Sequence, residues 1–398
     1  MNNRNEFVDF SDTETAFASK SDKELRKSLW LFRVMNNGTL VDVATWLARW
    51  AVRWHIPFTK TMVKATIFDQ FVGGETLPDS QSAIEKLWKS RILSVLDYGA
   101  EGKSTEKDLD AACEQFVRSV LFAAASESVP VVSIKVSALA QNELLEKVQA
   151  EKALTPDENA RFNRVKERVN RICREAFQQS IKIFIDAEES WIQEPIDRMA
   201  EEMMERYNKD SVVVYQTLQM YRKDRYPYLL NLFEEARNRG YMLGAKLVRG
   251  AYMEKERERA EEFGYASPIH DTKAETDADF DKGILFCVDH FEEMASCAAT
   301  HNMQSCLYQA ELIGKRNLPR NHPHLNFCQL YGMSDHITFN LAANGYNVAK
   351  YVVYGKVEEV VPYLSRRAEE NTATKGEFGR EYSLLLTEFN RRKNHLSV

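Results

Sequence analysis

The sequence predicts an α/β protein with a (β/α)8, TIM-type barrel, and three observations support this fold class. Eight apolar, β-branched runs follow residue 88, and most are separated by stretches of helical character. The runs are continuously apolar, which is typical of parallel strands in a sheet covered on both faces. Eight such units over about 270 residues match the size of a closed barrel. An open, doubly wound sheet is the alternative.

We expect one strand in each of the eight runs. In chain order they are RILSVLDYG (91–99), VPVVSIKVSA (129–138), SIKIFIDAEE (180–189), DSVVVYQTLQMY (210–221), YMLGAKLVRGAY (241–252), MASCAATHN (294–302), HLNFCQLYGM (324–333) and YNVAKYVVYG (346–355).

Residues 1–88 look helical and form no obvious sheet, so we predict an N-terminal helical arm there and the barrel over 89–398. Within the arm, residues 42–71 alternate apolar and basic residues at helical spacing and include Trp46, Trp50 and Trp54. Such a stretch either packs its aromatic rings on the main domain or rests on a membrane surface as a basic amphipathic helix.

The interval 141–178 is longer than the other connections and is rich in alternating charge. We predict a solvated helical hairpin inserted after the second strand, with Pro156 and Asp157 at its turn.

Composition and charge exclude several classes of protein. A formal net charge of −6 argues against nucleic-acid binding. No apolar run reaches the roughly 18 residues of a spanning helix, and the N-terminus lacks a signal sequence, so we expect an intracellular, cytoplasmic protein. Six scattered cysteines without a CxxC pair make a zinc site or a disulfide framework improbable. We interpret His322-Pro-His324 as a loop and predict no metal.

A polar residue lies near the end of each predicted strand. In a barrel these carboxyl ends meet at one mouth, where active sites are found. The residues are Asp97, Lys135, Asp186, Gln219, Lys246 with Arg249, Thr300 with His301, Gln329 and Tyr351.

Lys135 and Lys246 are flanked by apolar residues. A lysine inside a strand is costly without an anionic partner. The partner is either Asp97 or Asp186 in an ion pair, or a bound anion or electron-rich cofactor, and we favour the second.

Arg249-Gly250-Ala251 follows the fifth strand. The glycine permits close backbone approach to a ligand, and the arginine suits phosphate. The chain has no GxGxxG and no GxxxxGK[ST], so a bound dinucleotide is not held by a Rossmann or Walker loop.

The stretch PYLSRRAEEN (362–371) follows the last strand. On a helix, Tyr363 and Glu370 each lie one turn from Arg366 and Arg367. The adjacent arginines point about 100° apart and suit one small carboxylate. The alternative is an exposed basic turn with a helical salt bridge.

Taken together, these residues resemble the proline dehydrogenase family. The matching segments run in order from the first strand end to the arginine pair: SIKVSAL (133–139), IDAEE (185–189), TLQMY (217–221), KLVRGAYMEKE (246–256), ATHN (299–302), FCQLYGM (327–333) and YVVYG (351–355) followed by PYLSRRAEEN.

The resemblance implies a distorted (β/α)8 barrel that binds FAD at the carboxyl ends of its strands, with the arginine helix roofing the substrate. It implies the following roles. Arg366, Arg367 and Lys135 bind the proline carboxylate; Tyr351 and Tyr363 wall the ring, with Leu330 opposite; Glu370 orients the arginines and is counted with the cofactor shell; Glu101 pairs with Arg366 as a gate.

Toward the flavin, the resemblance implies a second set of contacts. Gln219 and Lys246 contact the isoalloxazine, Arg249, Gly250 and Ala251 follow the ribityl chain and pyrophosphate, Thr300 and His301 lie toward the nucleotide, and Asp186 and Ala187 complete the shell. Asp271 departs from the threonine that many bacterial relatives carry, so the adenosine contacts there stay open.

The implied activity is oxidation of L-proline to Δ1-pyrroline-5-carboxylate by hydride transfer to flavin N5, with Lys135, Asp186, Lys246 and Tyr351 as candidate catalytic residues. Electrons would pass to a membrane quinone, which implies a peripheral contact with the inner face of the membrane. Two rivals are a Schiff-base aldolase using Lys135 or Lys246, and a non-catalytic barrel that binds amino acids.

Overall fold

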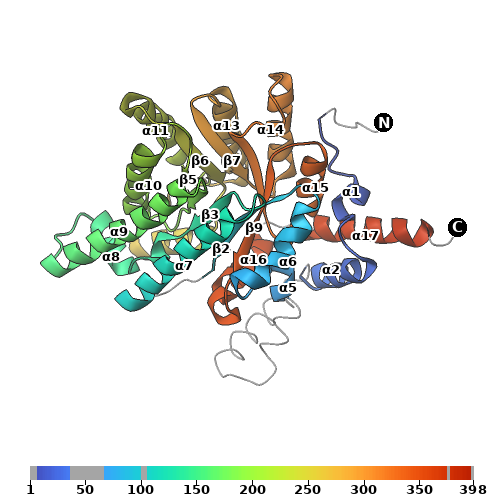
Figure 1. The fold of residues 1–398 in the computed structure, drawn as a ribbon, viewed down its shortest axis with the longest axis horizontal. Helices are drawn as coiled ribbons and strands as arrows, with labels where there is room; N and C mark the ends of the chain where they lie inside the picture. The colour runs from blue at the N-terminus through green and yellow to red at the C-terminus, as the bar shows by residue number, and fades with distance from the viewer. Residues whose placement is uncertain (1–6, 36–66, 100–104, 374–376, 396–398) are drawn as a thin grey trace.

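A computed structural model describes residues 7–35, 67–99, 105–373 and 377–395, and side chains are described outside 367–378. Eight parallel strands, β2 to β9, close into a barrel (Figure 1). Closure is made by β9, which pairs with β2 on one side (Val95 with Tyr351) and with β8 on the other (Leu330 with Tyr351). The predicted barrel is confirmed, and the open doubly wound sheet is excluded.

Every predicted run contains one barrel strand. The strands are β1 (Val72–Gly74), β2 (Leu93–Tyr98), β3 (Val131–Ile134), β4 (Lys182–Ile185), β5 (Val214–Gln219), β6 (Leu243–Val248), β7 (Met294–Ala299), β8 (Leu325–Leu330) and β9 (Val348–Tyr354).

Helices α6, α7, α9, α10, α11, α13 and α15 pack against the strands, and α14 packs beside α13 (Figure 1). The described helices are α1 (Thr13–Phe17), α2 (Asp22–Met35), α5 (Asp69–Phe71), α6 (Leu77–Trp88), α7 (Glu106–Ala124), α8 (Asn142–Gln149), α9 (Pro156–Gln178), α10 (Gln193–Tyr207), α11 (Arg225–Arg239), α12 (Met253–Phe263), α13 (Lys273–Asp289), α14 (Met303–Lys315), α15 (Asp335–Ala343), α16 (Val357–Ala373) and α17 (Glu377–His395), with a 3-10 turn, η2 (Val136–Ala138).

Local sequence explains where several of these helices begin and end. Thr155 and Thr272 start α9 and α13 with capping boxes, in which each threonine and a glutamate three residues later satisfy each other's backbone N–H groups. Gly240 ends α11 in the left-handed conformation, with a φ of 67°. The ends of these helices are thus set by local sequence.

The prediction that residues 1–88 form no sheet is wrong at one place. The short strand β1 lies in that range and pairs in parallel with the end of β9, Val72 with Val353 and Gly74 with Tyr354. Because β2 occupies the other edge of β9, β1 extends the edge beyond the end of β8. Part of the predicted arm is therefore built into the sheet beside the mouth.

The prediction of a solvated hairpin over 141–178 is also wrong for its larger part. Helix α9 packs against α7 and α10 as a regular covering helix of the barrel. Val165, Val169 and Ile172 are buried at helical spacing, and buried Arg168 pairs with Glu106 at 2.6 Å. Pro156 is the first residue of α9 rather than part of the turn. The many charged residues cover only its outer face.

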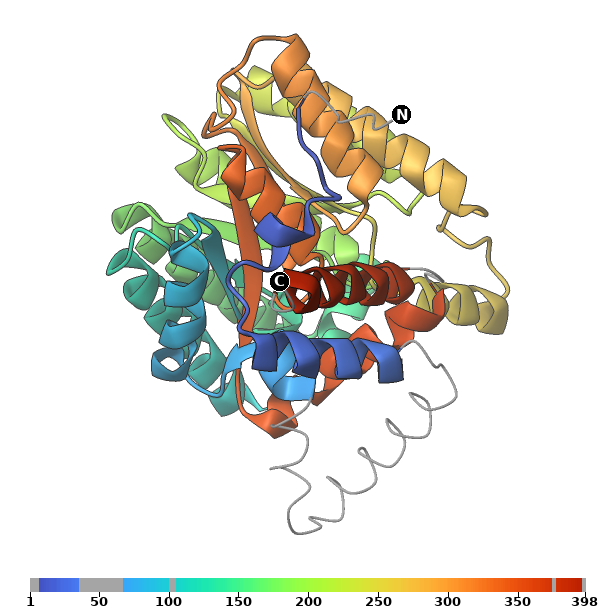
Figure 2. The ribbon, with the colours of Figure 1, turned by 90° about the vertical axis from the view of Figure 1, so that its right-hand side faces the viewer.

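The N-terminal helices and the C-terminal helix lie together on one side of the barrel. Both views place α2 beside α17 and α1 near α15 (Figures 1 and 2), and these pairs are in contact. A hydrophobic cluster runs without a break from the barrel interior, through Tyr351 and Phe71, to Phe32 of α2 and Leu385 of α17. This part of the arm is thus packed on the barrel, whereas Trp46, Trp50 and Trp54 lie outside the described residues.

The cysteines and the His322-Pro-His324 segment lie in the core and in a loop, respectively. All six cysteines are buried and free. His322 and His324 lie in the connection before β8, where the His324 backbone N–H donates to His322 Nδ1 at 3.2 Å. Within the described ranges, no three His, Cys, Asp or Glu side chains form a group able to hold a metal ion. The described helices also include none with the length and apolar character needed to cross a bilayer.

Candidate active site

The Asp186 carboxylate, directly after β4, is the centre of a buried polar cluster at the barrel mouth. It accepts hydrogen bonds from Lys135 Nζ at 2.9 Å, Lys246 Nζ at 2.6 Å, the Tyr351 hydroxyl at 2.7 Å and Ser133 Oγ at 2.9 Å. These donors come from β6, β9 and the strand and turn of β3. The barrel therefore brings together three side chains that the sequence predicted separately.

Charge in this cluster is balanced between two lysines and two aspartates. Lys135 Nζ lies 2.9 Å from Asp186 and 3.7 Å from Asp97. Burial opposes the charged form of Lys135, but the two carboxylates hold its pKa well above the usual range. Burial alone would raise the pKa of Asp186, whereas Lys135 and Lys246 hold it well below its usual range. The structure thus shows ion pairs of these lysines with Asp97 and Asp186, and a bound anion or cofactor beside them stays a prediction.

Tyr351 contacts the cluster through its ring as well as through its hydroxyl. Its ring centroid is 4.9 Å from Lys246 Nζ and 6.0 Å from Lys135 Nζ. Burial and the charge of Asp186 raise the pKa of Tyr351 well above the usual range, so its hydroxyl stays protonated and donates. Tyr363 and Tyr351 belong to one buried hydrophobic cluster, and the half-buried Leu330 packs against that cluster.

Arg366 reaches the mouth from α16, the helix that follows β9. Its side chain is half-buried, and its guanidinium carbon lies 5.9 Å from the ring centroid of Tyr252. Arg366 therefore does not simply extend into solvent. The side chains of Arg367 and Glu370, and the whole of Glu101, lie outside the described residues.

Tyr252 is a site residue that sequence reasoning missed. It is buried, and burial raises the pKa of its hydroxyl well above the usual range, so the hydroxyl is neutral near pH 7. Its only sequence signal is its place within the family segment KLVRGAYMEKE, directly after Gly250 and Ala251.

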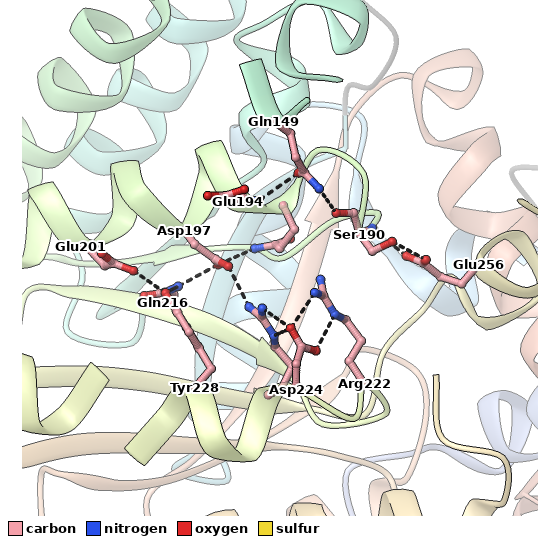
Figure 3. Close-up of polar contacts among 12 residues, drawn as sticks. Gln149, Ser190, Glu194, Asp197, Glu201, Gln216, Arg222, Asp224, Tyr228 and Glu256 are labelled. Carbon is pink, nitrogen blue, oxygen red and sulfur yellow. Dashed lines mark hydrogen bonds and ion pairs between the residues drawn. The ribbon is translucent and has the colours of Figure 1, made fainter. Parts of the chain in front are cut away.

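The segment that carries Tyr252 is anchored by the buried carboxylate of Glu256 (Figure 3). Glu256 is fully buried and accepts from the backbone N–H and the hydroxyl of Ser190, both at 2.6 Å. Gln149 Nε2 donates to the Ser190 carbonyl at 2.6 Å, which ties α8 to the same loop. The Glu256 N–H in turn donates to the Tyr252 carbonyl at 2.9 Å. The start of α12 is thereby fixed to the loop after Asp186.

A second network in Figure 3 supports the loop that follows β5. Arg225 donates to Asp197 at 2.7 Å and also pairs with Asp224, which pairs in turn with Arg222 at 2.8 Å. Gln216 of β5 donates to Asp197 at 2.7 Å. These charged groups compensate one another, and the network holds the strand end that carries Gln219.

Polar atoms near the end of β5 are available to a large cofactor. Gln219 Oε1 and Thr217 Oγ1 are buried, and neither has a hydrogen-bond partner among the described residues. Thr217 is in register with Lys246 on β6. Buried acceptors without partners are costly, so they fit a group that brings its own hydrogen-bond donors.

Arg249 lies on the same side of the mouth and is rigidly held. Its guanidinium bonds to Thr300 Oγ1 at 2.6 Å, to Ser305 Oγ at 3.1 Å and to Asp277 at 2.7 Å. His301 Nδ1 lies 2.8 Å from Ser334 Oγ. The predicted residues Arg249 and Thr300 are thus in direct contact, while His301 faces the loop after β8.

Gly250 has a backbone conformation that requires glycine. Its φ is +139°, and a Cβ there would lie 2.5 Å from the ring of Tyr221. The neighbouring Ala251 is exposed, and Ala187, after Asp186, is half-buried. Glycine here lets the main chain after β6 pass directly against the Tyr221 ring.

Glu188 is a further buried acid that sequence reasoning did not single out. It is 2% exposed, and its carboxylate accepts from the Ser137 backbone N–H at 2.9 Å. Burial raises the pKa of Glu188 to about 7. Its charge therefore changes near neutral pH, beside the η2 turn that follows Lys135.

The fold and the site together define a class: an enzyme-type (β/α)8 barrel with its polar cluster at the carboxyl ends of the strands. Comparison with known proteins identifies the family. The family model for proline dehydrogenase matches residues 80–380.

Individual relatives agree with the family model. The carbapenem antibiotics biosynthesis protein CarD of Pectobacterium carotovorum is 33% identical over 322 residues, covering 81% of this chain and 83% of its own. Proline dehydrogenase 1, mitochondrial, of Drosophila melanogaster is 35% identical over 249 residues, covering 60% of this chain but 37% of its own. Proline dehydrogenase 2, mitochondrial, of Arabidopsis thaliana is 28% identical over 97% of this chain and 90% of its own.

A solved structure shows the same fold. Proline utilization A (PutA) from Bdellovibrio bacteriovorus superposes with a TM-score of 0.70 at 21% identity, covering 91% of this chain and 38% of that chain. The chain belongs to the proline dehydrogenase family, which confirms the resemblance seen in the sequence. It is accordingly an oxidoreductase of proline metabolism built on a TIM barrel.

Replacing Asp186 tests the charge balance of the cluster. Asp186→Ala leaves Lys246 buried beside no carboxylate, so we expect the free energy of unfolding to fall by about 3–5 kcal/mol in chemical denaturation. Asp69→Ala, which breaks the exposed pair with Lys27, is the control and costs at most about 1 kcal/mol. A similar loss of unfolding free energy in both variants would contradict the idea that Asp186 stabilises the fold by neutralising the buried lysines.

Glu188 predicts a pH dependence of stability. Its folded pKa of about 7 lies above the usual 4.5, so the folded state holds the proton more tightly than the unfolded chain. This group therefore removes about 3 kcal/mol of stability as the pH rises from about 4.5 to about 7. Glu188→Gln lacks this loss, and its stability relative to wild type should rise over that window. The exposed Glu143→Gln is the control, and parallel curves for all three proteins would refute the prediction.

Proposed function

We propose that this protein binds FAD and oxidises L-proline to Δ1-pyrroline-5-carboxylate, the first step of proline catabolism to glutamate. The observation that carries the proposal is the Asp186 cluster, in which Lys135, Lys246 and Tyr351 converge at the barrel mouth. Family membership supplies the reaction, and the cluster supplies residues suited to it.

The substrate carboxylate would be held by Arg366, Arg367 and Lys135. Arginine pairs with a carboxylate through two parallel N–H donors, and Lys135 adds a second positive charge from the opposite side. Lys135 stays protonated because Asp97 and Asp186 hold its pKa high. Glu370 would orient the arginines, and Glu101 would close the site against Arg366.

The proline ring would lie between the aromatic side chains of Tyr351 and Tyr363 and the half-buried Leu330. An apolar wall on both sides excludes water and fixes the ring carbon next to the nitrogen. Because Asp97 and Asp186 balance the charges of Lys135 and Lys246, the cluster presents no net charge to the ring nitrogen.

Toward the cofactor, Gln219 and Lys246 would contact the isoalloxazine, with Asp186 and Ala187 in the same shell and Glu370 at its edge. Arg249, Gly250 and Ala251 would follow the phosphates, and Thr300 and His301 the nucleotide. When bound, FAD supplies the hydride acceptor, flavin N5; the protein supplies orientation and electrostatics.

The cluster argues against a Schiff-base aldolase. Such an enzyme needs a neutral lysine amine, whereas the pKa of Lys135 is held well above its usual range and Lys246 Nζ is 2.6 Å from a carboxylate. Membership of the proline dehydrogenase family weighs against a barrel that only binds amino acids.

The visible spectrum tests the proposal and Arg366 together. We expect the purified protein to be yellow and its flavin band to bleach anaerobically with L-proline. Arg366→Met should raise the proline concentration for half-maximal bleaching about 10- to 100-fold, because one charged hydrogen-bonding partner is lost. Arg380→Met, an exposed arginine on α17, is the control. A colourless protein, or a flavin that L-proline does not reduce, would overturn the proposed function.

We further propose a membrane quinone as electron acceptor and a location in the cytoplasm, with peripheral contact at the inner face of the membrane through the tryptophan-rich arm. A soluble quinone analogue should be reduced with L-proline faster than molecular oxygen, and the protein should sediment with lipid vesicles. Replacing Trp46, Trp50 and Trp54 by serine should abolish sedimentation and leave reduction of the analogue intact. Full sedimentation of that variant would exclude the arm as the contact.

A further inference from the structure

A second buried Lys–Asp–Lys arrangement lies on the outer side of the barrel. Asp335, the first residue of α15, pairs with Lys350 Nζ at 2.9 Å and with Lys20 Nζ at 3.2 Å. Lys350 is 1% exposed and neighbours Tyr351 on β9, so their side chains point to opposite faces of the sheet. Burial would raise the pKa of Asp335, but Lys350 and Lys20 hold it well below its usual range. We call these three residues the outer triad.

The outer triad is bonded to the main chain that carries Leu330. Lys350 Nζ donates to the Leu330 carbonyl at 3.4 Å and to the Met333 carbonyl. On the other side, the Leu330 N–H donates to His301 Nε2 at 3.4 Å. The backbone of Leu330 is therefore held between Lys350 and the end of β7.

The N-terminal segment touches the same loop at a second point. Gln70 Nε2 donates to the Gly332 carbonyl at 2.7 Å, and Ser28 Oγ donates to Gln70 Oε1 at 3.2 Å. Gly332 has a φ of +79°, and a Cβ there would lie 1.9 Å from the Gln70 carbonyl oxygen. The loop after β8 is thus shaped by close contact with a segment more than 250 residues earlier in the chain.

Lys20 stands at the free end of the outer triad. It lies between α1 and α2, on the side of the barrel where these helices meet α17 (Figure 2). Its side chain is 17% exposed, whereas Asp335 and Lys350 are more deeply buried. Loss of the Lys20 charge leaves Asp335 paired with Lys350 alone, which frees that carboxylate, and the Lys350 ammonium with it, to shift.

We propose that Lys20 is a positioning residue for substrate selection. Through Asp335 it fixes Lys350, and Lys350 fixes the main chain of Leu330, which forms one wall of the proline ring pocket. The inference rests on the proposed function, since it assigns Leu330 to that pocket. Lys20 and the N-terminal segment would thereby help determine the size of the substrate ring that the enzyme accepts.

The test compares L-proline with L-pipecolate, its six-membered homologue, in wild type, Lys20→Met and Lys20→Arg. We expect Lys20→Met to raise the KM for L-proline about fivefold to twentyfold with kcat within about twofold. It should raise the pipecolate-to-proline ratio of kcat/KM about threefold to tenfold, a part of the roughly 10- to 200-fold that one methylene is worth in an apolar pocket. Lys20→Arg keeps the charge and should restore most of the wild-type ratio. Lys27→Met, which removes the exposed pair of α2 with Asp69, is the control.

Gln70→Leu provides a second variant that leaves the buried charges in place and removes the bonds of Gln70 to Gly332 and to Ser28. It should shift the substrate ratio in the same direction as Lys20→Met. An unchanged ratio in both variants, or failure of both to fold, would reduce the segment to a structural role and overturn the inference. A wild-type protein that does not oxidise L-proline would instead overturn the proposed function.

Discussion

The buried carboxylate of Asp186 is the constraint on which the rest of the site depends. A single carboxylate at the barrel mouth is stable only because two ammonium groups and two hydroxyls satisfy it. Those donors come from strands that only a closed barrel brings together. The same contacts that neutralise Asp186 also fix Lys135, Lys246 and Tyr351, so stability and preorganisation of the site have one cause.

Secondary contacts extend this order outward from the mouth. Glu256 and Ser190 lock the segment that carries Tyr252, and Arg249 is held by Thr300 and Asp277. On the outer side, the N-terminal segment packs through a continuous hydrophobic cluster and through the ion pair of Lys20 with Asp335. Elements far apart in the chain thus meet around one opening, and each fixes a loop that borders it.

Much of the fold could be predicted from the sequence, and the failures have physical reasons. Strands covered on both faces are apolar throughout, so all eight barrel strands were visible, and with them the polar residues at their ends. Helix α9 was misjudged because the charged residues on its outer face outnumber its buried stripe of Val165, Val169 and Ile172. Strand β1 has only three residues, too few to show a period.

The site was less completely predicted than the fold. Asp186, Lys135 and Lys246 were found because strand ends are easy to locate, but whether the lysines face carboxylates or a ligand depends on distances that no sequence contains. Tyr252 could not be assigned a role from the sequence, since one aromatic residue after a glycine turn has no distinguishing pattern. Lys20, Asp335 and Lys350 come from three distant segments, and only the folded chain makes them one group.

The role of the Asp186 cluster is tested most directly by a crystal structure of the protein with reduced FAD and L-proline. A reduced flavin cannot accept a further hydride, so the bound proline stays intact. We expect the proline carboxylate within hydrogen-bonding distance of Arg366 and Lys135, and the ring between Tyr351 and Leu330, above an intact Asp186 cluster. Proline bound away from these residues, or a cluster in which Asp186 has left both lysines, would contradict this expectation.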